Sequence, residues 1–561
     1  MKPTSTPSLH SLTADAVGSG VHGAAALLWL PQAALLAWAV QGLATGQGMA
    51  AVWWPAAGIL LLGLLRAVAE AWAGRRIFAA ARAHLSRLRM LVAASLSAGS
   101  PLDRTRAPSG LAASVIAEQA EAIVPYLVRY QPARWRLALV PPIILAVVAS
   151  QSWLAALVLL LAAPLIPVFM VIVGRGAQAA SKAQMVEMGG MNAFLLDRLR
   201  GLATLRALGA VGATADRLGD AAQSLRRRTM AVLRIAFLSS AVLELFSALG
   251  VAMVAVYVGF HLLGTLDFGG WGQRLSLGQG LFILLLAPAF FEPLRELAAV
   301  WHDSAAGKAA LQALEQLARH EIPLPGTQME VRAADSGPTR LPTAPAIVVR
   351  DLHFAHPGEA PLFAGLDLRV AAGEHVALLG ASGSGKTALL SLLAGLMPAA
   401  RGQIAIGGVA LSDRSIGALR QRIGWMGQHP HVFAGAVEAN VALGRAGITT
   451  AKVQAAIDLA WLDGVAQARP LAMLGEGGSG LSGGEAVRLA LARLAVQVDA
   501  DLLLVDEPTA HLDTDTANRV GEALIALAQG KTLIVATHDP VLAARLGRVI
   551  RLDALALEQA A

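Results

Sequence analysis

Residues 380–387 read GASGSGKT, and this stretch decides how the C-terminal part of the chain folds. It matches the pattern G-x-x-x-x-G-K-[ST], follows the strand-like run 375–379 and precedes a helix-like run from Ala388. A phosphate-binding loop requires this strand–loop–helix context, because its glycines let backbone N–H groups surround phosphates at a helix N-terminus. The sequence therefore predicts a nucleotide site between a strand and a helix.

The positions of this loop have different expected roles. We expect Lys386 to reach the β- and γ-phosphates of ATP and the hydroxyl of Thr387 to bind Mg²⁺. Backbone groups of the remaining positions would surround the phosphates; these are Gly380, Ala381, Ser382, Gly383, Ser384 and Gly385. A glycine-rich stretch can be only a turn, but here all four fixed positions agree with the flanking elements.

An acidic pair follows a second strand-like run. Residues 502–505 are apolar and end in Asp506 and Glu507. A buried strand that delivers an acid at its C-terminal end is the usual way to hold Mg²⁺ beside a phosphate loop. We expect Asp506 to bind the metal ion and Glu507 to polarise an attacking water. Two carboxylates after a strand can instead cap a turn, but the phosphate loop favours the catalytic reading.

The order of strand-like and helix-like segments in the C-terminal part indicates an α/β domain. Short apolar runs at 347–350, 375–379, 502–505 and 532–536 alternate with helix-like segments. Such alternation is typical of a parallel sheet covered by helices. We assign residues 346–561 to this domain and 321–345, which is rich in Pro, Gly and Thr, to a linker.

The first 320 residues predict a helical membrane domain. Residues 16–65 and 137–174 contain no Asp, Glu, Lys or Arg, and a span needs about 20 apolar residues. The second run suits two spans joined by a turn near Ser152. With the first run divided near 42–48, six spans result, at about 22–43, 50–72, two within 137–174, 236–262 and 276–299.

Charge supports a membrane rather than a nucleic-acid partner. Only 15% of the residues are charged, against about 25% in soluble domains. Residues 1–345 hold 28 basic and 18 acidic residues, a net charge of +10, and residues 346–561 hold 17 and 20, a net charge of −3, which gives +7 for the chain. The loops 75–136 and 175–234 carry ten basic residues each, which predicts that both loops, both termini and the α/β domain are cytoplasmic. The chain has no cysteine, so thiolate metal sites and cysteine nucleophiles are excluded.

These two loops read as helical hairpins. Apolar residues recur at helical spacing in 78–96 and 194–208, with few helix breakers. Their tips are expected near 101–109 and 209–215. The arginines alone would serve as topology determinants, but that role does not explain why two such long helical extensions exist.

A third motif identifies the superfamily. Residues 481–485 read LSGGE shortly before the acidic pair, and the chain here resembles the ABC transporter ATPases. The resemblance implies that ATP lies between two such domains, with Ser482, Gly483 and Gly484 serving the partner's nucleotide. It also implies Q-loop, D-loop and switch positions, in the family's order, at Gln428 (a further Mg²⁺ contact), Asp513 and His538, with Glu507 and His538 catalytic.

Two positions depart from the family pattern. Glu485 stands where glutamine is usual, which places a negative charge near phosphate. His356 stands where an aromatic residue usually stacks on adenine, and imidazole stacks less well than phenol.

Six spans followed by an ATPase resemble ABC exporters of the six-helix, crossed-over kind. Longer stretches at 163–205, 229–244, 287–295 and 506–513 are similar to the D subunits of CydDC-type exporters. That resemblance implies a bacterial inner-membrane heterodimer with a C-type half-transporter. It also implies ATP-driven export of glutathione and cysteine in support of cytochrome bd assembly and periplasmic redox balance, with a haem role as an alternative.

Candidate cargo-binding residues are few. Ionisable groups inside membrane spans are functional candidates, although internal ion pairs explain them equally well. These candidates are Glu244, Glu292 and Arg295, and His302 is a candidate haem ligand. Glutathione is anionic and would need arginines that face the cavity. A lipid or peptide exporter and an ATP-gated, non-transporting regulator remain alternative functions, although an intact Glu507 argues against a regulator that only binds ATP.

Overall fold

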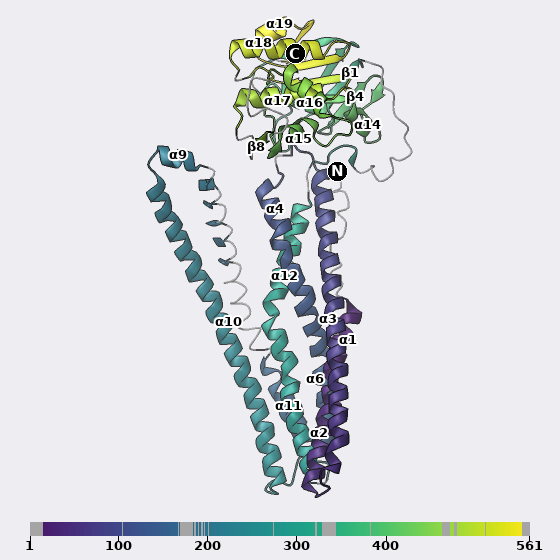
Figure 1. The fold of residues 1–561 in the computed structure, drawn as a ribbon, viewed down its shortest axis with the longest axis vertical. Coiled ribbons are helices and arrows are strands. Elements are labelled where there is room, and N and C mark those ends of the chain that lie inside the picture. The colour runs from purple at the N-terminus through teal and green to yellow at the C-terminus, as the bar shows by residue number, and fades with distance from the viewer. Residues whose placement is uncertain are drawn as a thin grey trace. The chain divides into compact units, whose positions relative to one another are not determined.

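In the computed structural model the chain forms two compact units (Figure 1). The first contains residues 1–93 and 107–319, and the second contains residues 94–106 and 320–561. The described residues are 15–103, 105–166, 168, 183–184, 187–188, 190–191, 194–195, 197–199, 201–272, 274–319, 322–327, 344–381, 383–462, 472–475, 480–510 and 512–552.

The first unit is helical. Its elements are α1 (Ala16–Leu27), α2 (Trp29–Ala44), α3 (Ala50–Ala98), α4 (Ser109–Ala117), η1 (Gln119–Ala122), α5 (Ile123–Pro125), η2 (Tyr126–Tyr130), α6 (Gln131–Gln151), α7 (Trp153–Ala162), α9 (Leu202–Ala207), α10 (Val211–Leu262), α11 (Leu277–Ala299) and α12 (Trp301–Leu317). The C-terminal end of α3, from residue 94, belongs to the second unit.

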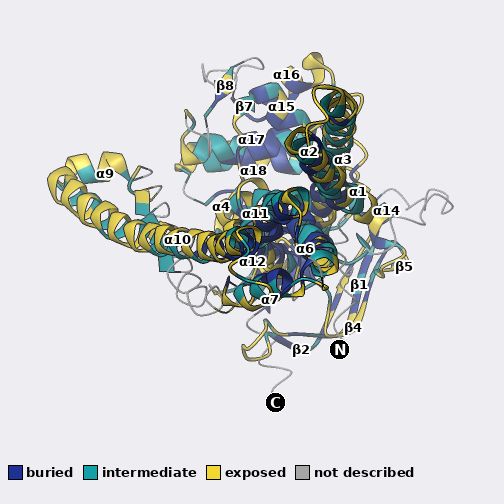
Figure 2. Cartoon of the chain, turned by 90° about the horizontal axis from the view of Figure 1, so that it is seen from below, coloured by how far each residue is buried: buried dark blue, intermediate teal, exposed yellow. Residues whose placement is uncertain are grey.

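An apolar core joins helices that are distant in sequence. Side chains of α6, α7, α10 and α11 form one buried cluster that includes Ile144, Leu159 and Phe291. Away from this core, α3 exposes Trp53 and Trp54 at 71% and 82%, and Figure 2 shows exposed residues along much of α10. Exposed apolar surface of this extent on helices is what a bilayer covers.

Five helical segments are long and apolar enough to cross a membrane, among the residues that the structure describes. They are Ala16–Ala44, Ala50–Ala98, Ser109–Gln151, Ala241–Leu262 and Leu277–Leu317. The fourth expected span begins with the short apolar helix α7 and then continues into residues outside the described part. The count of six spans therefore stays a prediction.

The expected turns of this unit are confirmed. The chain turns at Ser152, whose hydroxyl caps α7 at Ala155 N and donates to Gly269 O at 2.7 Å. The first hydrophobic run divides between residues 44 and 50, and the first loop tip lies between α3 and α4. The second turn lies between Ala207 and Val211, so only the start of the predicted tip at 209–215 is a turn, and the rest is the first part of α10. One break was not expected: α1 and α2 separate at Leu28, close to Pro31, which lacks an N–H for the helical ladder.

The second unit is the α/β domain. Its strands are β1 (Ile347–Phe354), β2 (Phe363–Val370), β3 (His375–Leu379), β4 (Arg401–Ile406), β5 (Val409–Ala410), β6 (Ile423–Met426), β7 (Gly435–Ala436), β8 (Met473–Leu474), β9 (Leu502–Asp506), β10 (Thr532–Ala536) and β11 (Arg548–Arg551). Its helices are α13 (Lys386–Leu393), α14 (Ile416–Gln421), α15 (Val437–Ala442), α16 (Thr450–Leu459), α17 (Gly483–Ala495), α18 (Thr514–Leu527) and α19 (Pro540–Ala544).

A parallel five-stranded sheet forms the centre of this domain, in the order β11-β3-β10-β9-β6. A four-stranded antiparallel sheet, β2-β1-β4-β5, accompanies it. Successive residues of β10 enter different cores: Leu533 and Val535 join one apolar cluster, and Ile534 and Ala536 join the other. Both faces of the parallel sheet are therefore buried, which explains the continuous apolar runs seen in the sequence.

Residues 94–106 pack within the second unit. The hydroxyl of Ser100 donates to Leu396 O at 2.6 Å, just after α13, and Leu102 packs against the adjoining apolar cluster. Backbone bonds also join this segment to residues 322–324. The first predicted loop tip, up to residue 106, thus belongs to the same compact unit as the α/β domain.

Candidate functional site

The phosphate loop connects β3 to α13 as predicted. Gly383 and Gly385 have φ angles of +87° and +92°, and glycine adopts this left-handed region without steric cost. Lys386 is buried, and its Nζ donates to Gly380 O at 2.8 Å and to Ala381 O at 3.0 Å. The ammonium group is thus held inside the loop by the loop's own carbonyls. Ser382 lies outside the described residues.

Asp506 ends β9 beside this loop. It is 1% exposed, and its Oδ2 accepts a hydrogen bond from Thr387 Oγ1 at 2.7 Å. Its Oδ1 is buried without a hydrogen-bond partner among the described residues. Because β3 and β9 both pair with β10 in parallel, their carboxyl ends meet at one edge of the sheet.

The hydroxyl oxygen of Thr387 and the unpartnered Oδ1 of Asp506 are suitable ligands for Mg²⁺. The ion prefers hydroxyl, carboxylate and phosphate oxygens, and an orphaned carboxylate oxygen beside a phosphate loop supplies the expected donor. Gln428, the third residue expected to contact the metal, follows β6 and is exposed. Its strand pairs with β9, which places Gln428 at the same edge of the sheet.

Burial raises the pKa of Asp506, and the neighbouring Glu507 adds to this effect, while the hydrogen bond from Thr387 opposes it. The folded domain therefore holds a proton on Asp506 more readily than the unfolded chain does. That stabilisation is complete below the pKa of an unfolded aspartate, about 3.9, and is lost as the pH rises through the folded pKa. Above the folded pKa the ionised carboxylate destabilises the domain when no cation is bound.

Replacing Asp506 by Asn should therefore raise the melting temperature of the nucleotide-free protein at pH 8 more than at pH 5. The same change should remove most of the stabilisation by Mg-ATP, which amounts to about 2.7 kcal/mol at 100-fold saturation for an intact site. Thermal unfolding with and without Mg-ATP measures both effects. Exposed Asp499→Asn is the matched control, and a lower melting temperature for Asp506→Asn at both pH values would contradict the electrostatic argument.

Glu507 and His538 form a second pair at this edge. Glu507 is 7% exposed, and its Oε2 lies 2.7 Å from His538 Nδ1 and 3.3 Å from His538 N, which donates to it. Its backbone has φ +50°, a left-handed conformation that is uncommon outside glycine. The imidazole of His538 is mostly exposed. The carboxylate of Glu507 is thus buried in the domain, whereas the ring of His538 that it contacts is open to solvent.

The signature segment begins α17. The hydroxyl of Ser482 accepts from Glu485 N, and the carboxylate of Glu485 accepts from Ser482 N at 2.7 Å. This reciprocal pair is a capping box, which explains Glu485 physically: a glutamate at the third helical position closes the helix start. Gly483 and Gly484 follow Ser482 in the first turn of the helix.

Two further predicted residues have local structural partners. Asp513 caps α18 by accepting from Thr516 N at 2.9 Å, and this bond lowers the pKa of Asp513. The ring of His356 packs edge to face on Phe354, with centroids 5.1 Å apart. Whether Asp513 and His356 also contact nucleotide stays a prediction.

A half-buried arginine that the sequence did not predict supports the signature helix. Arg493 on α17 donates to His431 O at 2.6 Å and to Asn440 O at 2.7 Å, and burial lowers its pKa. It therefore ties the signature helix to the segment that follows Gln428. Arginine within an amphipathic helix gives no sequence signal for such a role.

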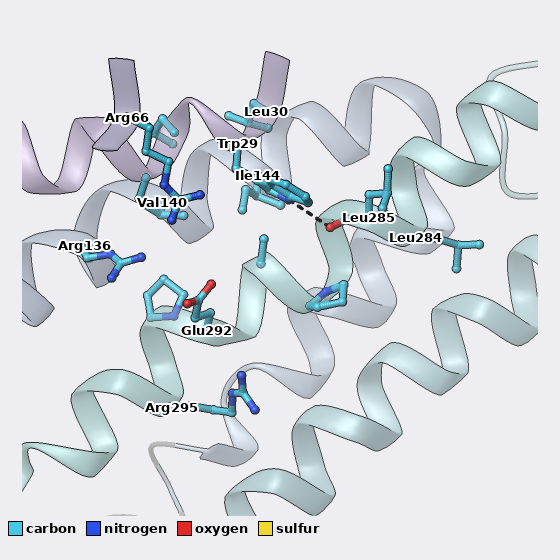
Figure 3. Close-up of a pocket in the computed structure, with 15 residues that line it drawn as sticks. Trp29, Leu30, Arg66, Arg136, Val140, Ile144, Leu284, Leu285, Glu292 and Arg295 are labelled. Carbon is cyan, nitrogen blue, oxygen red and sulfur yellow. Dashed lines mark hydrogen bonds between the residues drawn. The ribbon is translucent and has the colours of Figure 1, made fainter. Parts of the chain in front are cut away.

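Two of the four cargo candidates line a cavity of about 390 Å³ in the first unit (Figure 3). Glu292 and Arg295 of α11 are joined there by Arg66 of α3 and Arg136 of α6. Glu244 of α10 does not line the cavity; its Oε1 accepts from Arg295 Nη1 at 3.1 Å. The sequence did not single out Arg66 and Arg136, because an arginine beside a cytoplasmic loop also fits a topology role.

The fourth candidate, His302, lies elsewhere. Its Nε2 lies 3.2 Å from Asp303 Oδ1 at the start of α12, and its side chain is 74% exposed. Haem ligation by His302 stays a prediction.

Comparisons with known proteins agree with both units. The ABC transporter family matches residues 363–510, and the ABC transporter transmembrane region matches residues 136–294. A bacterial Atm1-family ABC exporter with ATP bound has a similar fold, with a TM-score of 0.73 at 22% identity over 97% of each chain.

Curated relatives are more similar in sequence. The glutathione/L-cysteine transport system ATP-binding/permease protein CydD of Escherichia coli is 37% identical over 77% of this chain and 72% of its own length. CydD of Haemophilus influenzae is 34% identical over 85% of this chain and 80% of its own length. CydC of Bacillus subtilis is 30% identical over 74% and 70%.

These matches confirm a multi-pass ABC exporter subunit with an ATPase domain that couples ATP hydrolysis to transport. The chain belongs to the CydD family of ABC half-transporters.

Proposed function

We propose that this chain uses ATP to export a small thiol, glutathione or L-cysteine, from the cytoplasm of a bacterium. It works as the D-type subunit of a heterodimer with a C-type half-transporter in the inner membrane, with both termini and the ATPase domain in the cytoplasm. Such export supports cytochrome bd assembly and periplasmic redox balance. The observation that carries the ATPase part is the pair of contacts at one sheet edge, Thr387 to Asp506 and Glu507 to His538.

The residues divide the work of hydrolysis. When Mg²⁺ is bound, it neutralises phosphate charge and orients the transferred group. Thr387 and Asp506, with Gln428, are the residues that would hold it. Lys386 turns from its loop carbonyls to the phosphates, and Glu507 accepts a proton from the attacking water.

His538 completes the site at the γ-phosphate. In the structure its Nδ1 lies 2.7 Å from Glu507 Oε2, so an N–H at Nδ1 donates to that carboxylate. With a proton on both ring nitrogens, Nε2–H can also donate to a phosphate oxygen. Ser482, Gly483, Gly484 and Asp513 would serve the nucleotide bound by the C-type subunit, and His356 would contact adenine.

The cargo assignment rests on the family and on the charged cavity. The names of the CydD and CydC relatives state glutathione and L-cysteine transport. A cavity with three arginines and one glutamate suits a small charged molecule better than a lipid tail. We include haem as the alternative cargo, with a lipid as the third possibility.

Transport by the purified heterodimer in inside-out vesicles tests the proposal. We expect ATP-dependent accumulation of labelled glutathione, of cysteine or of both, and none in vesicles given a non-hydrolysable ATP analogue. Haem and a fluorescent lipid are the parallel substrates. An active ATPase that moves neither thiol would reject thiol export, and uptake of haem or lipid alone would identify the alternative.

A further inference from the structure

We infer that the cavity in the membrane unit is a subsite for the zwitterionic amino-acid group of the cargo, and that it recognises charges rather than the thiol. This inference rests on the proposed export function and deepens it. Arginines would bind carboxylates, and Glu292 would bind the ammonium group.

The cavity has a charged part and an apolar part. Its volume of about 390 Å³ lies within the range of roughly 300–1,000 Å³ that is usual for small-molecule sites. Arg66, Arg136, Glu292 and Arg295 form the charged part. The apolar part includes Trp29, Leu30, Val140, Ile144, Leu284 and Leu285.

Each arginine is held by a carboxylate that does not itself line the cavity. Arg66 Nε lies 2.8 Å from a carboxylate on its own helix, Arg136 Nη1 lies 2.8 Å from one on α11, and Arg295 Nη1 lies 3.1 Å from one on α10. These carboxylates belong to Glu70, Glu296 and Glu244. The pairs fix the guanidinium groups and use only part of their donors, since each guanidinium has five N–H groups.

Unused donors remain in this wall. The Nε atoms of Arg136 and Arg295 are buried and have no hydrogen-bond partner among the described residues. A buried donor without an acceptor is costly, and the cost is higher for a charged group. A carboxylate that enters the cavity would bond to the accessible N–H groups of these arginines and neutralise guanidinium groups whose Nε atoms have no acceptor.

Glu292 supplies the opposite charge. It lines the same cavity, is exposed, and forms no ion pair with the other described residues. Figure 3 draws it between Arg136 and Arg295 in this view. An ammonium group would neutralise this carboxylate, whereas a cargo with carboxylates alone, such as haem, would meet repulsion at Glu292.

The apolar part leaves no specific partner for sulfur. A thiol is uncharged at neutral pH and a weak hydrogen-bond donor, so it packs against aliphatic and aromatic side chains much as a methyl group does. An analogue with the same charges and no sulfur should therefore bind about as well as the thiol itself.

Three ligands test this inference in the wild-type heterodimer, without any variant. Each is measured as a competitor of ATP-dependent glutathione uptake into inside-out vesicles: glutathione, γ-glutamyl-2-aminobutyryl-glycine, which lacks the thiol, and N-acetylglutathione, which lacks the ammonium group. We expect the sulfur-free analogue to compete as well as glutathione. N-acetylglutathione should compete roughly 10- to 100-fold more weakly, the effect of one charge-assisted hydrogen bond.

Substitution then assigns the ammonium to its residue. Glu292→Gln should weaken glutathione roughly 10- to 100-fold and leave N-acetylglutathione unchanged, so that the two compete equally. Arg66→Gln should weaken both ligands. Glu118→Gln and Arg274→Gln, exposed residues that do not line the cavity, are the matched controls and should leave both affinities and the ATPase rate at wild-type levels.

The outcomes separate this inference from the export function. If the wild type transports glutathione but N-acetylglutathione competes equally well, or if only thiols compete, the charge-recognising subsite is wrong and thiol export stands. A Glu292→Gln variant that weakens both ligands by the same factor would also overturn the assignment of the ammonium. Absence of any ATP-dependent uptake of glutathione and cysteine by the wild type would instead reject the proposed function.

Discussion

Glu507→Gln is expected to lower ATP hydrolysis at this chain's site by roughly 10²–10⁴-fold, the usual contribution of a general base. Glutamine keeps the size of the side chain and can still bond to His538, but it cannot accept a proton from water. ATP binding should persist because the phosphate loop is unchanged. The measurement is ATPase activity of the heterodimer, with hydrolysis at the partner's site disabled, beside binding of labelled ATP.

The matched control is Glu522→Gln, because Glu522 is an exposed glutamate of the same domain. It should retain wild-type hydrolysis. Hydrolysis by Glu507→Gln within twofold of the control would remove Glu507 from the role of base, and loss of ATP binding would show instead that the carboxylate maintains the loop.

Lys386→Ala should have its main effect one step earlier, on nucleotide binding. We expect the ammonium to make charge-assisted bonds to phosphate, and the loss of one such bond lowers affinity roughly 10- to 100-fold. The variant also loses the two bonds from Nζ to the loop carbonyls, so the loop is less ordered before ATP arrives. Titration of the heterodimer with a fluorescent ATP analogue measures the affinity of this site.

Lys452→Ala is the control for this change, because Lys452 Nζ also donates to a backbone carbonyl, that of Gly447, at 3.0 Å on the exposed surface. It should bind ATP as the wild type does. Equal affinities for Lys386→Ala and Lys452→Ala would contradict a phosphate contact by Lys386.

Much of the ATPase fold was predictable from sequence because its signals are local. The apolar runs 375–379, 502–505 and 532–536 predicted buried strands, and the structure confirms all three. The phosphate loop and the acidic pair have fixed spacing and fixed residue types. Their meeting at one edge then follows from parallel strands that share a neighbour.

The rest depends on contacts that sequence spacing does not encode. Glu485 reads as a departure from a motif, and only the helix geometry shows it closing a capping box. Arg66 and Arg136 are 70 positions apart in sequence, and no local pattern distinguishes arginines that line a cavity from arginines that set topology. Glu244 and Arg295 were separate candidates, and the structure joins them in one ion pair.

The left-handed backbone conformation of Glu507 lowers the stability of the ATPase domain. A non-glycine residue with positive φ costs about 1–2 kcal/mol, and glycine would adopt the same conformation without that cost. The domain is therefore less stable than its own topology permits, at the residue whose carboxylate faces His538. Backbone stability alone would favour glycine at this position, and the contact between the Glu507 side chain and His538 offsets part of that cost.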